Sequence, residues 1–298
     1  MSKELAKLFA KRYIARSDVK AVQFDKDAGN FHAGDWFPDT KIDPSKRPNS
    51  PHLPHGFNME HLLAHIEGRR TYGHYLLDKD STCKVFCLDI DLKAKTDEWS
   101  GTWVKMPNWE DAPKEINLDK WAENQMVVTD CDPLALWRDR SRTAAPARAW
   151  FKYQMKMLSA ILLSKCQEAG IECAAAYSGS KGVHVYGFTD RMPAKEVRDA
   201  ALLVLELTDE FQPAKGKNFY KHTNNDPVHG FSNFSIEVFP KQDTLDGKSL
   251  GNLVRLPLGV NHKNAKDPTF FLDMTTGYTH FGPHPDPVRL LTEGNPFV

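Results

Sequence analysis

The sequence lacks an excess of charge of either sign, a long apolar run and paired cysteines. Lysine plus arginine and aspartate plus glutamate both number 39, so the formal net charge is zero, and any binding of nucleic acid must rely on local basic patches. There is no run of about 18 apolar residues, which argues against a membrane span. The charged N-terminal residues contain no apolar segment typical of a secretory signal. The five cysteines include no CxxC motif, which argues against a disulfide framework and for a cytoplasmic protein.

The chain is long and apolar enough for one large domain with a packed core. It has 298 residues, of which 41% are hydrophobic. We interpret it as a single catalytic domain with an N-terminal α/β module at 1–80, a core at 81–263 and a C-terminal extension at 264–298. In the module we expect helices near Leu5 and at 59–68, separated by a loop at 38–56 that is rich in proline and serine. A core insertion at 94–145 is expected to contain short helices and loops, and its tryptophans could stack bases or build a small satellite core. These are Trp99, Trp103, Trp109, Trp121 and Trp137.

The periodicity of the core predicts six elements in the order strand, helix, strand, strand, helix, strand. The strands fall at 83–93, 172–178, 182–188 and 234–240, and helical spacing runs through 151–169 and 197–211. This order is typical of a ferredoxin-like α+β fold, with a βαββαβ sheet related to RNA-recognition modules. In such a sheet the first strand lies between the third and the fourth, and the helices cover one face only.

Side-chain alternation places four polar residues on the face that the helices leave open. Asp89 and Asp91 share one face of the first strand, His184 lies on the third and Glu237 on the fourth. Because three converging carboxylates repel one another, we expect cations to neutralise them. Oxygen ligands favour Mg²⁺ or Mn²⁺ over zinc. Two such ions ~3.5–4 Å apart could activate a hydroxyl and stabilise a leaving phosphate.

The segment YSGSKGVHVYGF, residues 177–188, joins two of the predicted strands through a turn of small residues. Ser178, Ser180 and Lys181 could cradle phosphate groups with backbone N–H groups and a cation. Basic residues near the fourth strand, namely Lys241, Arg255 and Lys263, could neutralise phosphate charge as well.

Each of these features alone has an ordinary explanation. The turn is also a common hairpin, the Asp-x-Asp pair and Glu237 could be solvated, and His184 could be a hydrogen-bonded sheet residue. Their shared face and matching topology favour reading them together as a site.

Other candidate sites are weaker. His61 and His65 are spaced for zinc on a helix, with His52 and His55 upstream, but no cysteine or carboxylate completes the set, so we expect a solvent-facing helix. Cys83 and Cys87 are expected to be buried, small apolar residues. The segment 213–222 interleaves lysines with Phe and Tyr, and could either contact a nucleic-acid backbone or form a solvated loop.

The segments CLDIDL, SGSKGVHVY and IEVFPKQD…GNLVRLPLG, in this order, resemble the archaeo-eukaryotic primase superfamily, the primase-polymerases. The upstream segments RYIARSDVKAVQF and HLLAHIEGRRTYGHYLLDKDSTCKVFCLDID resemble the N-terminal module of members from phages, plasmids and CRISPR-linked loci. The resemblance implies that Asp89, Asp91 and Glu237 bind two Mg²⁺ or Mn²⁺ ions. It also implies that residues of the turn and a helper arginine contact the triphosphate of the incoming nucleotide: Ser178, Ser180, Lys181, His184 and Arg255.

The sequence departs from the family at three points. Glu237 stands where an aspartate is common, which could alter metal preference, and Gly182 stands where some members have serine, which removes one hydroxyl contact. The zinc-binding element that helps many primases to start a primer is not found, so initiation could depend on another domain or on the metal site alone.

These observations predict a template-dependent nucleotidyltransferase, a DNA primase-polymerase. Its partners would be a DNA template and primer, dNTPs or NTPs, and a helicase or accessory replication domain, with no membrane involvement. Two alternatives stay open at this point: a metal-dependent nuclease or phosphohydrolase that uses the same carboxylates, and a non-catalytic sheet that binds single strands with Tyr186, Phe188 and Phe239.

Overall fold

The computed structural model describes residues 2–25, 32, 34–38, 56–96, 101–105, 127–224, 226, 230–245, 250–263 and 267–294. Most of the predicted loop at 38–56 lies outside the described residues. So do His52 and His55, and three tryptophans of the insertion: Trp99, Trp109 and Trp121.

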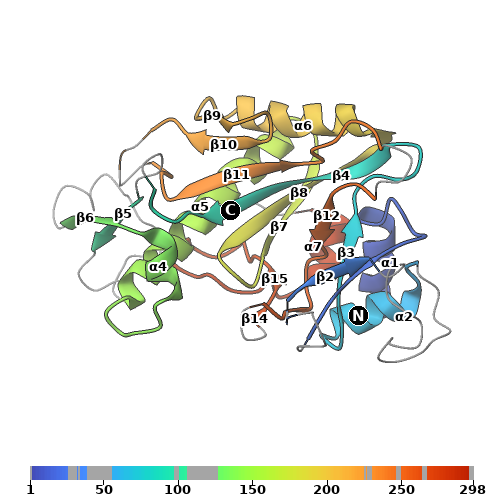
Figure 1. The fold of residues 1–298 in the computed structure, drawn as a ribbon, viewed down its shortest axis with the longest axis horizontal. Coiled ribbons are helices and arrows are strands. Elements are labelled where there is room, and N and C mark those ends of the chain that lie inside the picture. The colour runs from blue at the N-terminus through green and yellow to red at the C-terminus, as the bar shows by residue number, and fades with distance from the viewer. Residues whose placement is uncertain are drawn as a thin grey trace.

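A seven-stranded antiparallel sheet forms the centre of the molecule (Figure 1), in the order β15-β7-β8-β4-β11-β10-β9. The strand β4 lies between β8 and β11, which are the neighbours predicted for the first core strand. The central strands are β4 (Thr82–Leu92), β7 (Glu172–Tyr177), β8 (Gly182–Pro193) and β11 (Phe234–Phe239).

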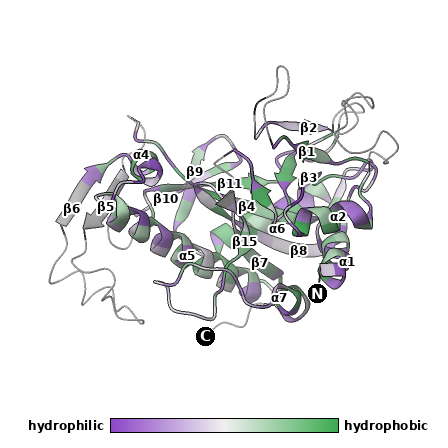
Figure 2. Cartoon of the chain, turned by 90° about the horizontal axis from the view of Figure 1, so that it is seen from below, coloured by the Kyte–Doolittle hydropathy of each residue, from purple (hydrophilic) through white to green (hydrophobic). Residues whose placement is uncertain are grey.

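Two amphipathic helices pack on one face of this sheet, α5 (Ala145–Glu168) and α6 (Ala194–Glu206). Both buried faces belong to the main hydrophobic core, as do Leu88 and Ile90 of β4. Figure 2 shows both hydrophilic and hydrophobic residues along α5, and this helix is buried on more than one side, since Lys156 faces the loop 276–280.

The second core helix is shorter than its apolar spacing predicted. It ends at Glu206, and Asp209 then adopts a positive φ of 54°, which no helix continues through. Phe211, predicted to be helical, begins the strand β9 (Phe211–Lys215), which pairs with β10 (Phe219–His222). The segment 213–222 is therefore an edge hairpin rather than a loop.

Three N-terminal strands and β12, from the part of the chain after the core strands, build a second, four-stranded sheet in the order β12-β3-β1-β2. Tyr13 follows the first helix and packs edge-on against Tyr186 and Phe188, with ring centroids 5.1 Å apart in both pairs. Part of the sheet face that we expected to be open is thus covered by this module. Its elements are α1 (Ser2–Arg12), β1 (Ala21–Gln23), β2 (Trp36–Pro38), α2 (Met59–Ile66), β3 (Thr71–Tyr75) and β12 (Leu253–Arg255).

The described part of the insertion contains a strand pair, where only helices and loops were predicted. It consists of β5 (Gly101–Lys105), β6 (Val127–Cys131) and the short helix α4 (Pro133–Arg138). Trp103 and Trp137 pack against the main core rather than forming a satellite core of their own.

The C-terminal extension returns to the main sheet, where β15 pairs with β7. None of the helices in the described ranges is long and apolar enough to cross a membrane. The remaining elements are β13 (Val260–Asn261), β14 (Asp267–Pro268), β15 (Phe270–Phe271) and α7 (Pro287–Glu293).

Candidate active site

Four predicted polar residues lie side by side on the three central strands. In the register of the sheet, Asp89 of β4 is directly opposite His184 of β8 on one side and Glu237 of β11 on the other. Asp91 is two residues further along β4, opposite Gly182 and Ser235. Because residues two apart share a face, all four side chains belong to the same face of the sheet. They are 14–23% exposed, so solvent reaches each only in part.

Two of the three carboxylates in this group form an ion pair with a lysine, while Asp89 faces His184. Lys181 Nζ lies 2.7 Å from Asp91 Oδ2, and Lys241 forms an ion pair with Glu237. Lys241 Nζ also lies 4.7 Å from the ring centroid of Phe239 and 5.5 Å from that of Phe219, so two aromatic faces support the cation.

A further lysine lies near the carboxylates. Lys93 Nζ is 5.8 Å from the ring centroid of Phe219, and burial lowers its pKa even though Asp91 and Asp89 oppose that shift. Among the described residues, no three His, Cys, Asp or Glu side chains are gathered closely enough to hold a metal ion. The carboxylates share a face, but Asp91 and Glu237 are each engaged with a lysine.

Asp89 and Asp91 have pKa values shifted in opposite directions. Burial, and next the charge of Asp89, raise the pKa of Asp91 to about 6. Burial would also raise the pKa of Asp89, but His184 and Lys181 outweigh it and lower that pKa overall. Because the repulsion between the two carboxylates opposes the ionisation of both, an additional positive charge nearby would stabilise the pair.

The donor chemistry of the group suits a divalent cation. Asp89 Oδ1 is buried and accepts no hydrogen bond, and it faces His184 Nε2 at 3.4 Å. All three acids offer oxygen ligands, which Mg²⁺ and Mn²⁺ prefer. Binding such an ion with all three acids would require Lys181 and Lys241 to release Asp91 and Glu237.

A hydrogen-bond chain fixes the ring of His184. Tyr186 Oη donates to the carbonyl oxygen of Arg255 at 3.0 Å and lies 2.8 Å from His184 Nδ1. Because the tyrosine proton is used on that carbonyl, His184 Nδ1 carries a hydrogen and donates to Tyr186. His184 Nε2 is thereby directed toward Asp89. Tyr186 lies on the predicted polar face, but sequence reasoning offered it only as a stacking surface.

The small-residue turn is held by its carbonyl oxygens. Asn261 Nδ2 donates to Ser178 O at 3.3 Å, and the guanidinium of Arg255 donates to the same oxygen. Burial lowers the pKa of Arg255. Arg255 was predicted to help bind phosphate. In the structure its guanidinium instead holds the carbonyl oxygen of Ser178.

Two further donors hold the other carbonyl of the turn. Trp137 Nε1 and Tyr177 Oη donate to Ser180 O, at 2.7 Å and 2.9 Å. Trp137 was not predicted to belong to the site, since no local pattern links it to a turn 43 residues away. Lys263, also considered for phosphate binding, lies in the turn after β13, with its backbone next to Gly34.

The prediction of a solvent-facing helix for the possible zinc histidines is wrong, because both side chains are buried. His61 and His65 are 4% and 0% exposed. His61 Nδ1 accepts from the backbone of Asn58 in a capping box. His65 Nδ1 accepts from Tyr72 N at 3.0 Å, while Nε2 lies 3.0 Å from Pro257 O. Both rings therefore make contacts that stabilise the fold, and the possibility of a zinc pair gains no support from them. Cys83 and Cys87 are fully buried, as predicted.

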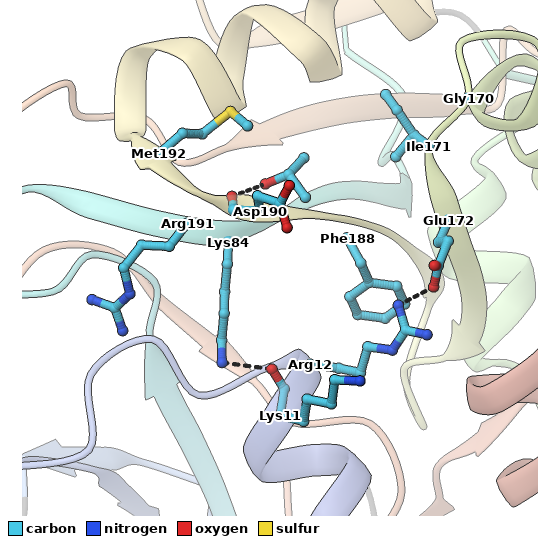
Figure 3. Close-up of a pocket in the computed structure, with 11 residues that line it drawn as sticks. Lys11, Arg12, Lys84, Gly170, Ile171, Glu172, Phe188, Asp190, Arg191 and Met192 are labelled. Atoms are coloured by element: carbon cyan, nitrogen blue, oxygen red, sulfur yellow. Dashed lines mark hydrogen bonds and ion pairs between the residues drawn. The ribbon is translucent and has the colours of Figure 1, made fainter.

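A cavity of about 570 Å³ lies where the end of α1 meets the far ends of β4 and β8 (Figure 3). Three of the four cations that line it are already engaged: Arg12 pairs with Glu172, Arg191 pairs with Asp78, and Lys84 Nζ donates to carbonyls at the end of α1. The cavity also lies several residues along both strands from the carboxylates, so it is not part of the candidate active site.

The fold is that of a mixed α/β protein with a group of acids on one face of its central sheet. A family model described as the Archaeo-Eukaryotic Primase domain of the TOTE conflict system matches residues 4–293. Since the match spans almost the whole sequence, the chain belongs to this family, and the resemblance seen in the sequence is confirmed. Domains of this kind generally have a nucleotidyltransferase-type fold, and enzymes of this kind typically use divalent metals. Comparison with curated proteins gave no match.

Proposed function

We propose that the chain is a template-dependent nucleotidyltransferase that extends, and in some settings begins, a DNA strand from nucleoside triphosphates. The observation that carries the proposal is the row of Glu237, Asp89 and His184 across three hydrogen-bonded strands, with the Ser178–Lys181 turn at its edge, in a chain of the primase family. We also propose that β4, α5, β7, β8, α6 and β11 form a ferredoxin-like palm that supports this row.

In the proposed reaction, the primer 3′-oxygen attacks the α-phosphorus of the bound triphosphate. One P–O bond forms, the bond between the α-phosphorus and the bridging oxygen breaks, and pyrophosphate leaves. Asp89, Asp91 and Glu237 would hold divalent cations, which supply activation of the hydroxyl and stabilisation of the leaving group. Lys181 and His184 Nε2 would position the phosphates from the opposite strand.

The two lysine pairs have a direct consequence for substrate binding. When the carboxylates take up metal ions, Lys181 and Lys241 lose their partners and become available to the phosphates of the nucleotide. Metal ions and triphosphate are therefore expected to bind together, each supplying the charge that the other needs.

The surroundings of Gly182 and Glu237 bear on two of the departures from the family pattern. A Cβ at Gly182 would clash with the backbone oxygen of Ile90 and lie 2.6 Å from Asp91 Oδ1, so serine does not fit here without moving a carboxylate. The longer Glu237 is engaged by Lys241, four residues along the chain. We propose that this lysine compensates for the longer side chain by holding its carboxylate near Asp89.

The proposal is tested by nucleotide incorporation on a primed DNA template with Mg²⁺ or Mn²⁺. Asp89→Asn should reduce incorporation at least about 100-fold with little loss of fold, because it removes a partly exposed negative charge from the row. Asp190→Asn, an exposed acid near the other end of β8, is the matched control and should retain full activity.

Retained incorporation by Asp89→Asn would contradict the proposal. Shortening of labelled DNA with Mn²⁺ and no nucleotide would instead indicate a nuclease. DNA binding that persists unchanged in EDTA, without incorporation, would indicate a single-strand-binding module.

A further inference from the structure

The helix α4 connects the insertion to the small-residue turn through one side chain. Trp137 is 5% exposed, and its indole Nε1 donates to Ser180 O at 2.7 Å. The hydroxyl of Tyr177 donates to the same oxygen from the other side of the turn. A carbonyl that accepts two donors from two different elements is fixed in direction.

The position of Trp137 is itself well determined. The helix α4 begins with an N-cap, where Asp132 Oδ1 accepts from Ala135 N at 3.0 Å, and with Pro133 in its first turn. The strand β5 packs closely on this start, because a Cβ at Gly101 would clash with the ring of Pro133. The helix also contacts α5 of the core. The insertion therefore presents the indole to the turn as part of a packed unit.

The planarity of the peptide bond converts these carbonyl contacts into a direction for the N–H groups. In a trans peptide, the C=O of one residue and the N–H of the next point to opposite sides. Ser180 O points to Trp137 and Tyr177, so the N–H of Lys181 points away from them. Ser178 O points to Asn261 and Arg255, so the N–H of Gly179 points away from those side chains.

Gly179 adopts a φ of +66° between the two fixed carbonyls. Successive N–H groups in such a turn form a concave site for anions. The clamped carbonyls thus hold the turn in the shape that a phosphate group needs before any ligand is present.

We propose that Trp137 is a positioning residue that sets the affinity of this turn for nucleoside triphosphates, so that the insertion takes part in nucleotide binding. The inference rests on the proposed function and goes beyond it, because it assigns a role to a residue of the insertion. Trp137 acts through Ser180 O and does not itself touch the substrate.

The test compares Trp137→Phe with the wild-type protein and with Trp103→Phe, a matched tryptophan on β5 of the same insertion. Binding of dATP in the presence of Mg²⁺ is measured by titration calorimetry, and KM and kcat are measured on a primed template. Because one hydrogen bond is lost, Trp137→Phe should weaken dATP binding and raise KM by about 3- to 10-fold. The value of kcat should stay within about twofold, and Trp103→Phe should match the wild type.

A merely structural role gives a different pattern. Loss of active protein lowers kcat and leaves KM unchanged, and this result for Trp137→Phe would overturn the inference. Tyr177→Phe, which removes the second donor from the same oxygen, should raise KM in the same direction.

The inference and the proposed function fail in distinguishable ways. If the wild type binds dATP and Trp137→Phe binds it equally well, the inference is overturned while the proposed function stands. If the wild-type protein neither binds nor incorporates dATP, both are overturned.

Discussion

The buried histidine His74 makes the stability of this fold depend on pH in a calculable way. His74 lies on β3, is 0% exposed, and neither of its ring nitrogens makes a hydrogen bond with a described residue. Tyr13 packs edge-on against it, with ring centroids 6.0 Å apart. Burial lowers the pKa of His74 to about 3, so the ring is neutral in the folded protein at any physiological pH.

The sign of the effect follows from the two protonation states. An unfolded histidine titrates near pH 6.5, so below that pH the unfolded chain takes up a proton that folded His74 does not. The free energy of unfolding is therefore highest above pH 6.5, and the contribution of His74 falls as the pH is lowered toward 3. Between pH 7 and pH 5 the linkage relation gives a loss of about 2 kcal/mol from this residue.

His65 behaves in the same way. It is also 0% exposed, and burial lowers its pKa to about 4. It should therefore add a further loss of about 2 kcal/mol over the same interval. Replacing His74 should remove half of this combined loss and leave the other half.

The prediction is checked by urea unfolding of the wild type and His74→Phe at pH 7 and pH 5. The difference between the two pH values should be about 2 kcal/mol smaller for the variant, whatever its absolute stability. The exposed His280 provides the matched control variant, His280→Gln, whose difference between the two pH values is compared with that of the wild type. Equal pH sensitivity of His74→Phe and the wild type would refute the reasoning.

Three further predictions concern close packing, a buried charge and the lysine pairs. Gly182→Ala should lower the free energy of unfolding by at least 1–3 kcal/mol in urea titrations, because its Cβ meets Ile90 O and Asp91; wild-type stability would show that the strands separate easily. Lys156→Met should lower the free energy of unfolding by roughly 1–3 kcal/mol and make the loop 275–280 more sensitive to protease. The reason is that Lys156 is buried and its Nζ donates to the carbonyls of three residues of that loop. An unchanged digestion pattern would contradict this. Lys181→Met should raise the affinity for Tb³⁺ without nucleotide, measured by luminescence, because Asp91 loses its counter-ion; weaker Tb³⁺ binding would show that the lysine does not compete with metal.

Alternation along the strands was enough to predict which polar residues share one face of the sheet. Each core strand has one apolar set that must be buried, such as Leu88 and Ile90, and this fixes where Asp89 and Asp91 point. The order of elements then restricts which strands are neighbours. A slip by two residues would keep every side chain on its face, so these constraints do not fix the register, in which Glu237 and His184 lie directly opposite Asp89.

Patterns that depend on contacts distant in sequence were not predictable in this way. The apolar spacing of α6 continues to Phe211, but the backbone turns at Asp209, and Phe211 joins a strand because β10 offers a pairing partner. The polarity of His61 and His65 suggested solvent, yet local capping and the carbonyl of Pro257 satisfy both rings inside the protein. The bond from Trp137 to Ser180 likewise has no local signature.

The partners of the acids show most clearly where sequence reasoning stopped. The repulsion between Asp89, Asp91 and Glu237 indicated that cations must be present, and metal ions were the expected answer. Lys181 and Lys241 supply positive charge from the chain itself, so folding does not have to wait for a metal. The same carboxylate oxygens cannot be fully engaged by lysine and metal at once. In the proposed function, a divalent ion held by all three acids would displace the lysines, and a triphosphate that accepted them would lower the free energy of that exchange.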